Sequence, residues 1–457
     1  MEKKESQSTA GKAQSVLLSK WGILALGIGG CIGSGIITLL GYGIGITGHS
    51  VWLAFALALL MGFVLCLPVL FVTGTVCLPG GPYPLINAAF GKKVTGIYII
   101  TFFLNIPGVA LYGVAMAEYI RSFFPGISIR FASIVIFTVF LVYSLLGLRA
   151  IDKLQKATSA LLLVGLATFI IVGCGKADYS LLNPVTNPNF LANGVKGLIS
   201  AAFLLMYAVS QYGIMYYGRI AKNPRKDIPF AIVGTTIALT IVYIGMAVAS
   251  SAVLPLEVTA NQPLTYVAQA ILPSPVFVFF MIAGPMMALS TSLSASFVMY
   301  AEPIIVATKD GWFPKVLATT NKKGTAWVII LIEYLMVMIP ILLNWDIKMI
   351  ANSSLLIAAA TGIMRTAALI VIPKRYPEAW KNRQWGIKLP DWVFYLSAVL
   401  AIAIQAALAY NSVKSVELYI VIVTIVVVGL SIPYSVKMVN DNKITMKPLD
   451  LDQSEGK

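Results

Sequence analysis

Twelve apolar runs follow one another along the chain, and each is close to the length of a membrane-spanning helix. They lie at residues 21–43, 51–72, 94–117, 131–148, 157–172, 195–217, 230–253, 275–306, 326–343, 350–372, 392–410 and 416–433. A helix needs about 20 residues to cross the hydrocarbon core of a bilayer. Because 58% of the residues are hydrophobic and 11% are charged, the pattern predicts an all-α membrane protein with twelve transmembrane helices. We expect one transmembrane domain at 21–437, with polar tails at 1–20 and 438–457.

The distribution of basic residues predicts the orientation of the chain. Most of the 33 Lys and Arg residues fall in the two tails and in the loops on the same side as the tails. Basic loops stay on the cytoplasmic side, so we expect a multi-pass protein of the plasma membrane with both termini in the cytoplasm. The net charge of +15 then serves orientation and contact with membrane lipids, and it does not indicate a nucleic-acid partner.

The cysteine and histidine content argues against several kinds of site. The four Cys residues show no CxxC motif and no paired spacing, and His49 is the only histidine. We therefore expect no disulfide, no metal site and no cofactor. Scattered acids and one histidine also provide no nucleophile with its base, so the sequence predicts no catalytic residues and no enzymatic activity.

The first apolar run contains Gly33-Ser34-Gly35, flanked by Ile32 and Ile36. These residues put backbone that resists helix formation at bilayer depth. Lipid supplies no hydrogen-bond partners, so unpaired peptide groups persist there only where they line a protein-enclosed cavity or hold a ligand. The segment is interpreted as a binding feature. The alternative is that small residues let two helices pack closely.

The sixth run has a matching interruption. Residues 207–213 are polar in the middle of the run, and residues 223–229 close it with two prolines. Runs one and six are the first members of two halves of five runs each. Paired interruptions at corresponding positions are typical of an inverted-repeat transporter with its site near the midplane of the bilayer.

Five segments resemble, in the same order, motifs of the amino acid-polyamine-organocation permeases. They are residues 32–36 (IGSGI), 78–83 (LPGGPY) with Phe90-Gly91, 222–229 (KNPRKDIP), 309–314 (KDGWFP) and 376–378 (YPE). The resemblance covers about residues 20 to 435. It implies the LeuT-type fold, a 5+5 inverted repeat with two additional helices. It also implies a secondary transporter, a permease or exchanger, that moves amino acids by alternating access.

The two interruptions offer partners for both charges of an amino acid. Free N–H groups near Ser34, Gly35 and Ile36 suit a carboxylate, and unpaired carbonyls near residues 28–31 and 206–209 suit an ammonium group. With the residues that the resemblance implies, the predicted substrate-binding set is Cys31, Ile32, Gly33, Ser34, Gly35, Ile36, Met206, Ala208, Val209, Ser210, Gln211, Ser292 and Ser296. Ser210 stands where the family usually has glycine, which leaves less room beside the substrate. For the serines of run eight, ordinary interhelical hydrogen bonding is the alternative.

Two departures from the family concern coupling. Leu162 stands where some relatives carry a proton-responsive lysine, and Tyr212 where some carry an acid. These differences favour either exchange, which needs a counter-substrate, or facilitated movement. A coupling ion, H⁺ or Na⁺, remains an open alternative.

Three charged residues lie where charge is costly unless it is paired or hydrated. Arg219 and Glu302 reverse the charges usual in the family, and we expect them to form an ion pair that, with Tyr212, serves gating. A solvated helix end is the alternative. Arg365 lies within a span, with Glu118, Glu302 or Glu333 as possible partners, and binding of an acidic substrate is a further possibility.

The substrate class follows from the side chains that can be placed in the site. Because no acidic or basic side chain is assigned to it, small neutral amino acids are favoured. An organic amine or polyamine carrier is the alternative within transport, and it would need Glu118 or Glu302 to face the site. A non-transporting amino acid sensor would keep the same site.

Overall fold

The computed structural model describes residues 17–384, 389–446 and 449. Over these residues the chain forms helices and no strand, and one isolated bridge pairs Leu18 with Ala221. The all-α prediction is confirmed for this part of the chain. Residues 1–16, 447, 448 and 450–457 of the predicted tails lie outside the described residues.

Ten helical segments of the described chain are long and apolar enough to cross a membrane. Two further apolar helices, α7 (Ile129–Ser144) and α15 (Trp327–Leu342), are shorter. Several apolar segments of this kind indicate a multi-pass membrane protein. The count of twelve transmembrane helices and the inverted repeat stay predictions.

The helices follow the predicted runs in order. The longer ones are α1 (Lys20–Cys31), α4 (Val51–Thr73), α5 (Pro82–Phe102), α6 (Ala110–Phe123), α8 (Leu148–Gly175), α9 (Gly194–Leu205), α10 (Pro224–Ser251), α14 (Met287–Lys309), α16 (Ile347–Arg375), α18 (Asp391–Val413) and α19 (Leu418–Asn440). The shorter ones are α2 (Ser34–Ile37), α3 (Leu39–Thr47), α11 (Leu256–Thr259), α12 (Thr265–Ile271), α13 (Ser274–Met281) and α17 (Pro377–Lys381), with η1 (Gly48–Ser50), η2 (Phe103–Val109), η3 (Tyr179–Leu182), η4 (Met206–Ala208), η5 (Gln211–Arg219), η6 (Ile282–Met286) and η7 (Lys315–Ala318). The last helix ends three residues beyond the predicted domain boundary at 437.

Proline and glycine make two of the predicted runs irregular. The 3₁₀ helix η2, in the third run, contains Pro107, and the π-helix η6, in the eighth run, contains Pro285. Proline lacks the amide hydrogen that an unbroken α-helix uses, so the hydrogen-bond pattern changes there. Upstream of the third run, α5 bends at Gly91, whose φ of 79° is a conformation that glycine adopts readily.

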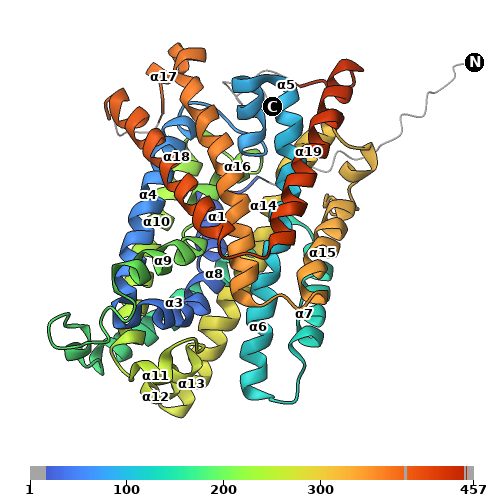
Figure 1. Cartoon of the computed structure of the whole chain (residues 1–457). Helices are drawn as coiled ribbons and strands as arrows, with labels where there is room; N and C mark the ends of the chain where they lie inside the picture. The colour runs from blue at the N-terminus through green and yellow to red at the C-terminus, as the bar shows by residue number, and fades with distance from the viewer. Residues whose placement is uncertain (1–16, 385–388, 447–448, 450–457) are drawn as a thin grey trace, which may run out of the picture.

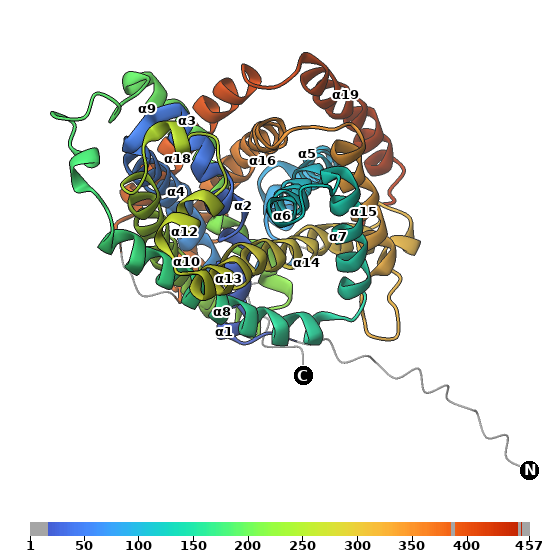
Figure 2. The ribbon, with the colours of Figure 1, turned by 90° about the horizontal axis from the view of Figure 1, so that it is seen from below.

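The helices stand side by side in one bundle (Figures 1 and 2). α1 packs against α8, α10 and α14, while α19 lies at the periphery against α5. The upper end of the bundle in Figure 1 holds the start of α5, the short helix α17 and the end of α19. The short helices α3, α11, α12 and α13 lie at its lower end. Chain direction therefore places α1 and η5 between the middle of the bundle and its upper end.

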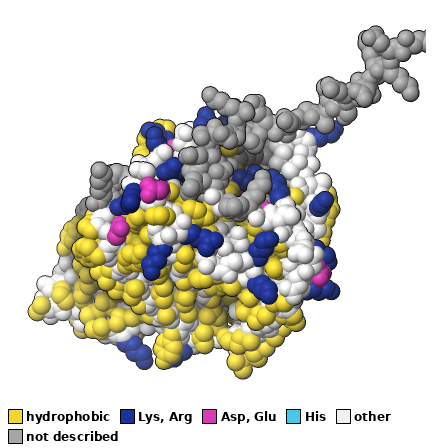
Figure 3. Space-filling view, turned by 90° about the horizontal axis from the view of Figure 1, so that it is seen from above, with side chains coloured by type: hydrophobic (Ala, Val, Ile, Leu, Met, Phe, Trp, Pro, Cys, Tyr) yellow, Lys and Arg dark blue, Asp and Glu magenta, His cyan; other side chains and the backbone are white. Residues whose placement is uncertain are grey.

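The surface of the bundle differs between its upper end and its sides. The upper end carries many Lys and Arg side chains and few acidic ones (Figure 3). Along its side, α19 exposes Leu418, Ile425 and Leu430. An apolar flank beside a charged end is what a protein held in lipid presents, since its sides face hydrocarbon and its ends face water.

Candidate functional site

The first predicted interruption is a break between two helices. α1 ends at Cys31, Ile32 takes a non-helical ψ of 89°, and α2 begins at Ser34. The hydroxyl of Ser292, on α14, donates to the carbonyl of Gly29 at 2.7 Å and lies 3.4 Å from that of Ile32. A neighbouring helix thus supplies hydrogen bonds to carbonyls at the break, as buried backbone requires.

The second predicted interruption is also present. α9 ends at Leu205, η4 covers Met206–Ala208, and Val209 takes a non-helical ψ of 70° before η5 begins at Gln211. Neither half beside this break is a regular α-helix, because both η4 and η5 are 3₁₀ helices. At this break the carbonyl of Ala208 accepts from the side chain of another helix.

One side chain joins the two breaks. Tyr243, fully buried on α10, places its hydroxyl 2.8 Å from the carbonyl oxygen of Cys31 and 3.0 Å from that of Ala208. A hydroxyl has one hydrogen, so it is shared between the two acceptors or alternates between them. The contact fixes the distance between the first and second interruptions.

Tyr243→Phe tests this link, because it removes the hydroxyl and keeps the ring. We expect lower thermal stability of the purified protein and weaker amino acid uptake. A buried carbonyl left without a partner costs about 1–3 kcal/mol. Tyr334→Phe is the matched control, since the Tyr334 hydroxyl contacts Thr138 at an exposed position. Equal melting temperatures and uptake in Tyr243→Phe and the control would remove the proposed link.

The glycines of the first break allow close packing. A Cβ atom added to Gly35 would lie 2.3 Å from the Cβ and 2.5 Å from the Cα of Ala208. One added to Gly33 would lie 2.1 Å from the Ser292 hydroxyl oxygen. The Gly-Ser-Gly segment thus interrupts the helix and also lets neighbouring segments approach closely, while its role in binding stays a prediction.

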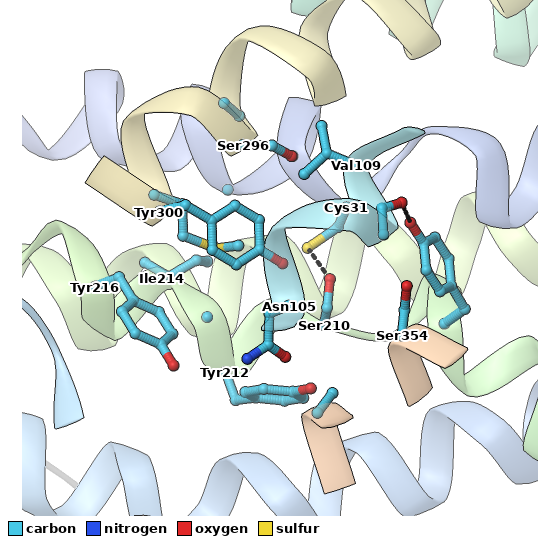
Figure 4. Close-up of a pocket in the computed structure, with 18 of the residues that line it drawn as sticks. Cys31, Asn105, Val109, Ser210, Tyr212, Ile214, Tyr216, Ser296, Tyr300 and Ser354 are labelled. Carbon is cyan, nitrogen blue, oxygen red and sulfur yellow. Dashed lines mark hydrogen bonds between the residues drawn. The ribbon is translucent and has the colours of Figure 1, made fainter. Parts of the chain in front are cut away.

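A cavity of about 110 Å³ lies beside the two breaks, toward the upper end of the bundle. On the same measure one water takes roughly 10–15 Å³, so the cavity has room for a solute of several heavy atoms. Of the residues predicted from sequence, Cys31, Met206, Ser210, Tyr212 and Ser296 line it. The thiol of Cys31 and the hydroxyl of Ser210 point toward one another at 3.7 Å (Figure 4).

Most of the other predicted substrate-binding residues do not line the cavity, and the side chain of Ser34 lies outside the described part of the structure. Those that do not line it are Ile32, Gly33, Gly35, Ile36, Ala208, Val209, Gln211 and Ser292. Gly33 and Gly35 are packed as described, and Ser292 supports the first break. Gln211 is fully buried, and among the described residues neither its amide nitrogen nor its oxygen has a hydrogen-bond partner.

Several lining residues were not predicted from the sequence. Asn105, Tyr112, Tyr300 and Ser354 come from η2, α6, α14 and α16. Figure 4 shows Asn105 close to Tyr212, on one side of the Cys31 and Ser210 pair. A polar residue inside an apolar run was the available signal for Asn105, but sequence spacing alone does not show which face of a helix meets a cavity.

Arg219 and Glu302 come together in a bidentate ion pair. Nη2 of Arg219 donates to Oε1 of Glu302 at 2.6 Å, and Nε donates to Oε2. A second contact involves Ile220, the residue after Arg219. The amide of Leu18 donates to the carbonyl of Ile220, and the carbonyl of Leu18 accepts from the amide of Lys222. The backbone that enters α1 is thus tied to the backbone that leaves η5.

Arg365 also lines the cavity, and its expected partners are not beside it. Glu302 is paired with Arg219, and among the described residues no carboxylate lies within 4 Å of Arg365. The guanidinium carbon instead lies 4.2 Å from the centre of the Tyr212 ring. The prediction of an acidic partner from Glu118, Glu302 or Glu333 is therefore wrong for this part of the chain. Helix spacing gave no information on which neighbour faces Arg365.

Comparison with known proteins identifies relatives that are named as amino acid permeases or antiporters. A sequence profile described as amino acid permease matches residues 18–430. The chain is 26% identical to a cadaverine/lysine antiporter of Escherichia coli, over 70% of this chain and 73% of that protein. It is 24% identical to a branched-chain amino acid permease of Bacillus subtilis, over 55% of this chain and 58% of that protein. An uncharacterised protein of Methanocaldococcus jannaschii is 23% identical, over 65% and 70% of the two chains. The chain, as its motifs indicated, belongs to the amino acid permease family.

Proposed function

We propose that this chain is a secondary transporter that moves small amino acids across the plasma membrane by alternating access, and that neutral amino acids are its favoured substrates. Both termini are cytoplasmic in this proposal, and residues 21–437 form one transporter domain of twelve helices with a 5+5 repeat. The observation that carries it is the pair of broken segments, joined by Tyr243 beside a cavity. Membership of the amino acid permease family supports the same function.

The cavity suits a small zwitterion. Hydroxyl groups of Ser210 and Ser296 and the amide of Asn105 line it among aromatic and apolar side chains. Such a surface binds a solute through a few placed polar groups and excludes water around the rest. Its volume of about 110 Å³ favours a small substrate.

The charge of the lining counts against the amine or polyamine alternative. A polyamine carrier needs a carboxylate in the site to pair with the ligand cation. Among the described lining residues none is acidic, and the one that carries a charge is the cation Arg365. Although one relative is named a cadaverine/lysine antiporter, a diamine in this cavity would meet a like charge.

The contacts above the cavity suit a gate. Ion pairing of Arg219 with Glu302 and the backbone pairing of Leu18 with the segment after η5 join elements on the upper side of the cavity. In alternating access these contacts break when the site faces the cytoplasm and re-form when it faces outward. Tyr212, on η5 and lining the cavity, moves with this gate.

Uptake into proteoliposomes tests the proposed function. We expect labelled alanine or serine to accumulate, and faster when the vesicles contain unlabelled amino acid, as exchange requires. Imposed Na⁺ and pH gradients identify a coupling ion if there is one. Vesicles with Gly35→Val protein serve as the inactive control. Saturable binding of amino acids without uptake under any gradient would instead support the sensor alternative.

A further inference from the structure

Arg365 is a buried cation at the edge of the cavity. It lies on α16, ten residues before the end of that helix, and is 4% exposed. The carbon of its guanidinium group lies over the ring of Tyr212, 4.2 Å from the ring centre, and the group also interacts with the hydroxyl of Tyr216. Its Nε has no hydrogen-bond partner within the part of the chain that the structure describes.

None of these neighbours balances the charge. An aromatic face and a neutral hydroxyl stabilise a guanidinium group, but they leave its full positive charge in place. Nearby Gln405, whose amide oxygen lies against Gly362, is neutral as well. A buried cation is costly unless it meets an anion, and an arginine stays protonated throughout the physiological range. The three acids that the sequence offered as partners do not fill this role in the described chain. Glu302 is paired with Arg219, and Glu118 and Glu333 do not line the cavity.

We propose that Arg365 binds a substrate carboxylate, and that the transporter accepts amino acids with a second carboxylate, such as aspartate and glutamate, in preference to their amides. This inference rests on the proposed function and extends its substrate class from neutral to acidic amino acids. The planar guanidinium group presents N–H donors in a fork that matches a carboxylate. A zwitterion would leave the site with one positive charge, whereas an acidic amino acid makes the whole complex neutral.

The position of Arg365 fits recognition of the second carboxylate. The broken segments near Cys31 and Ser210 supply polar groups at one part of the cavity. Tyr212 lies two residues beyond Ser210, and the guanidinium group of Arg365 lies over its ring. A ligand anchored by its α-amino and α-carboxylate groups at the breaks would therefore direct its side chain along η5 toward the guanidinium group.

The test compares ligands of equal size that differ in charge. Thermal stabilisation of the purified full-length protein is measured with glutamate, glutamine, aspartate and asparagine, and competition for labelled alanine uptake is measured in parallel. We expect each acid to act at concentrations at least about tenfold lower than its amide, which corresponds to about 1.4 kcal/mol. Equal potency of acids and amides in the unmodified protein would overturn the proposal.

Variants of Arg365 assign the preference to this side chain. In Arg365→Gln the acid preference should disappear while neutral amino acids still bind, which also shows that the variant is folded. Arg365→Lys keeps the charge and loses the planar fork, so an intermediate preference is expected. Arg130→Gln removes one charge from an exposed arginine and should keep the full preference. An acid preference that survives in Arg365→Gln would overturn the proposal.

Further arms separate this proposal from its alternatives. The measurements are repeated with gluconate in place of chloride. If chloride alone stabilises the protein through Arg365, and acids and amides remain equal, the side chain is an inorganic anion site and the proposal fails. If no amino acid is transported although glutamate binds through Arg365, transport fails as the function while the carboxylate site stands. If alanine is transported and no acid preference exists, only the carboxylate site fails.

Discussion

Gly35→Val is expected to abolish amino acid uptake, and Gly35→Ala to reduce it at least about a hundredfold, the effect of about 3 kcal/mol of strain. Even the single added carbon of alanine would lie 2.5 Å from the Cα of Ala208. That contact is with backbone, so no rotation of a side chain relieves it. The strain falls on the two broken segments, because Gly35 follows the first break and Ala208 precedes the second.

The measurement is uptake and ligand-induced thermal stabilisation, normalised to the amount of folded protein. Gly429→Ala is the matched control, because Gly429 is also helical and a Cβ atom there would meet nothing within 4 Å. The control should behave as the unmodified protein does. Wild-type affinity in Gly35→Ala would show that the two segments need not approach so closely for the site to form.

Charge reversal at the ion pair is expected to have the next largest effect. Arg219→Glu places two carboxylates together, and Glu302→Arg places two guanidinium groups together. Breaking a buried pair costs about 3–5 kcal/mol. We expect a value near the lower limit, because the Arg219 side chain is 30% exposed and that of Glu302 is 6% exposed. Each single variant should lose at least about tenfold in uptake, and the double swap should recover most of that loss.

The double swap is the informative measurement. Recovery of uptake in Arg219→Glu/Glu302→Arg shows that the two side chains act as a pair and not through separate contacts. No recovery in the double variant would rule out the pairing as a functional gate. Lys156→Glu, at the more exposed pair that Lys156 forms with Asp152, is the matched control and should change uptake little.

Much of the site could be predicted from particular residues. The break after Cys31 is where Gly33 and Gly35 lower helix stability, and the break around Val209 is where the sixth run turns polar. The pairing of Arg219 with Glu302 was predicted because the two residues reverse the charges usual in the family, and because a charge left unpaired in the membrane is costly. The signal in each case was legible in the sequence itself: glycine content, polarity within an apolar run, or charge.

Other features depended on which helix faces which. Ser292 proved to bond to the first break, whereas the hydroxyl of Ser296 donates to the carbonyl of Ser292 on its own helix. Tyr243 gave no sequence signal, since a tyrosine in an apolar run is usually packing. The sequence showed that a charge at Arg365 is costly, but it did not show which residues surround it. The position of Arg365 in the cavity led us to propose acidic amino acids as substrates in place of neutral ones alone.

The sequence by itself determined that this chain is a helical membrane protein, where its helices break and which charges need partners. These properties follow from local terms: hydrophobic length, backbone freedom at glycine and proline, and the cost of desolvating a charge. Only the tertiary structure decided that residues from both breaks line one cavity, and that Arg365 meets Tyr212 and no carboxylate of the described residues. Those outcomes depend on how each helix is rotated and how deep it lies against its neighbours. Packing between side chains that are distant in the sequence sets this rotation and depth, so no single segment encodes them.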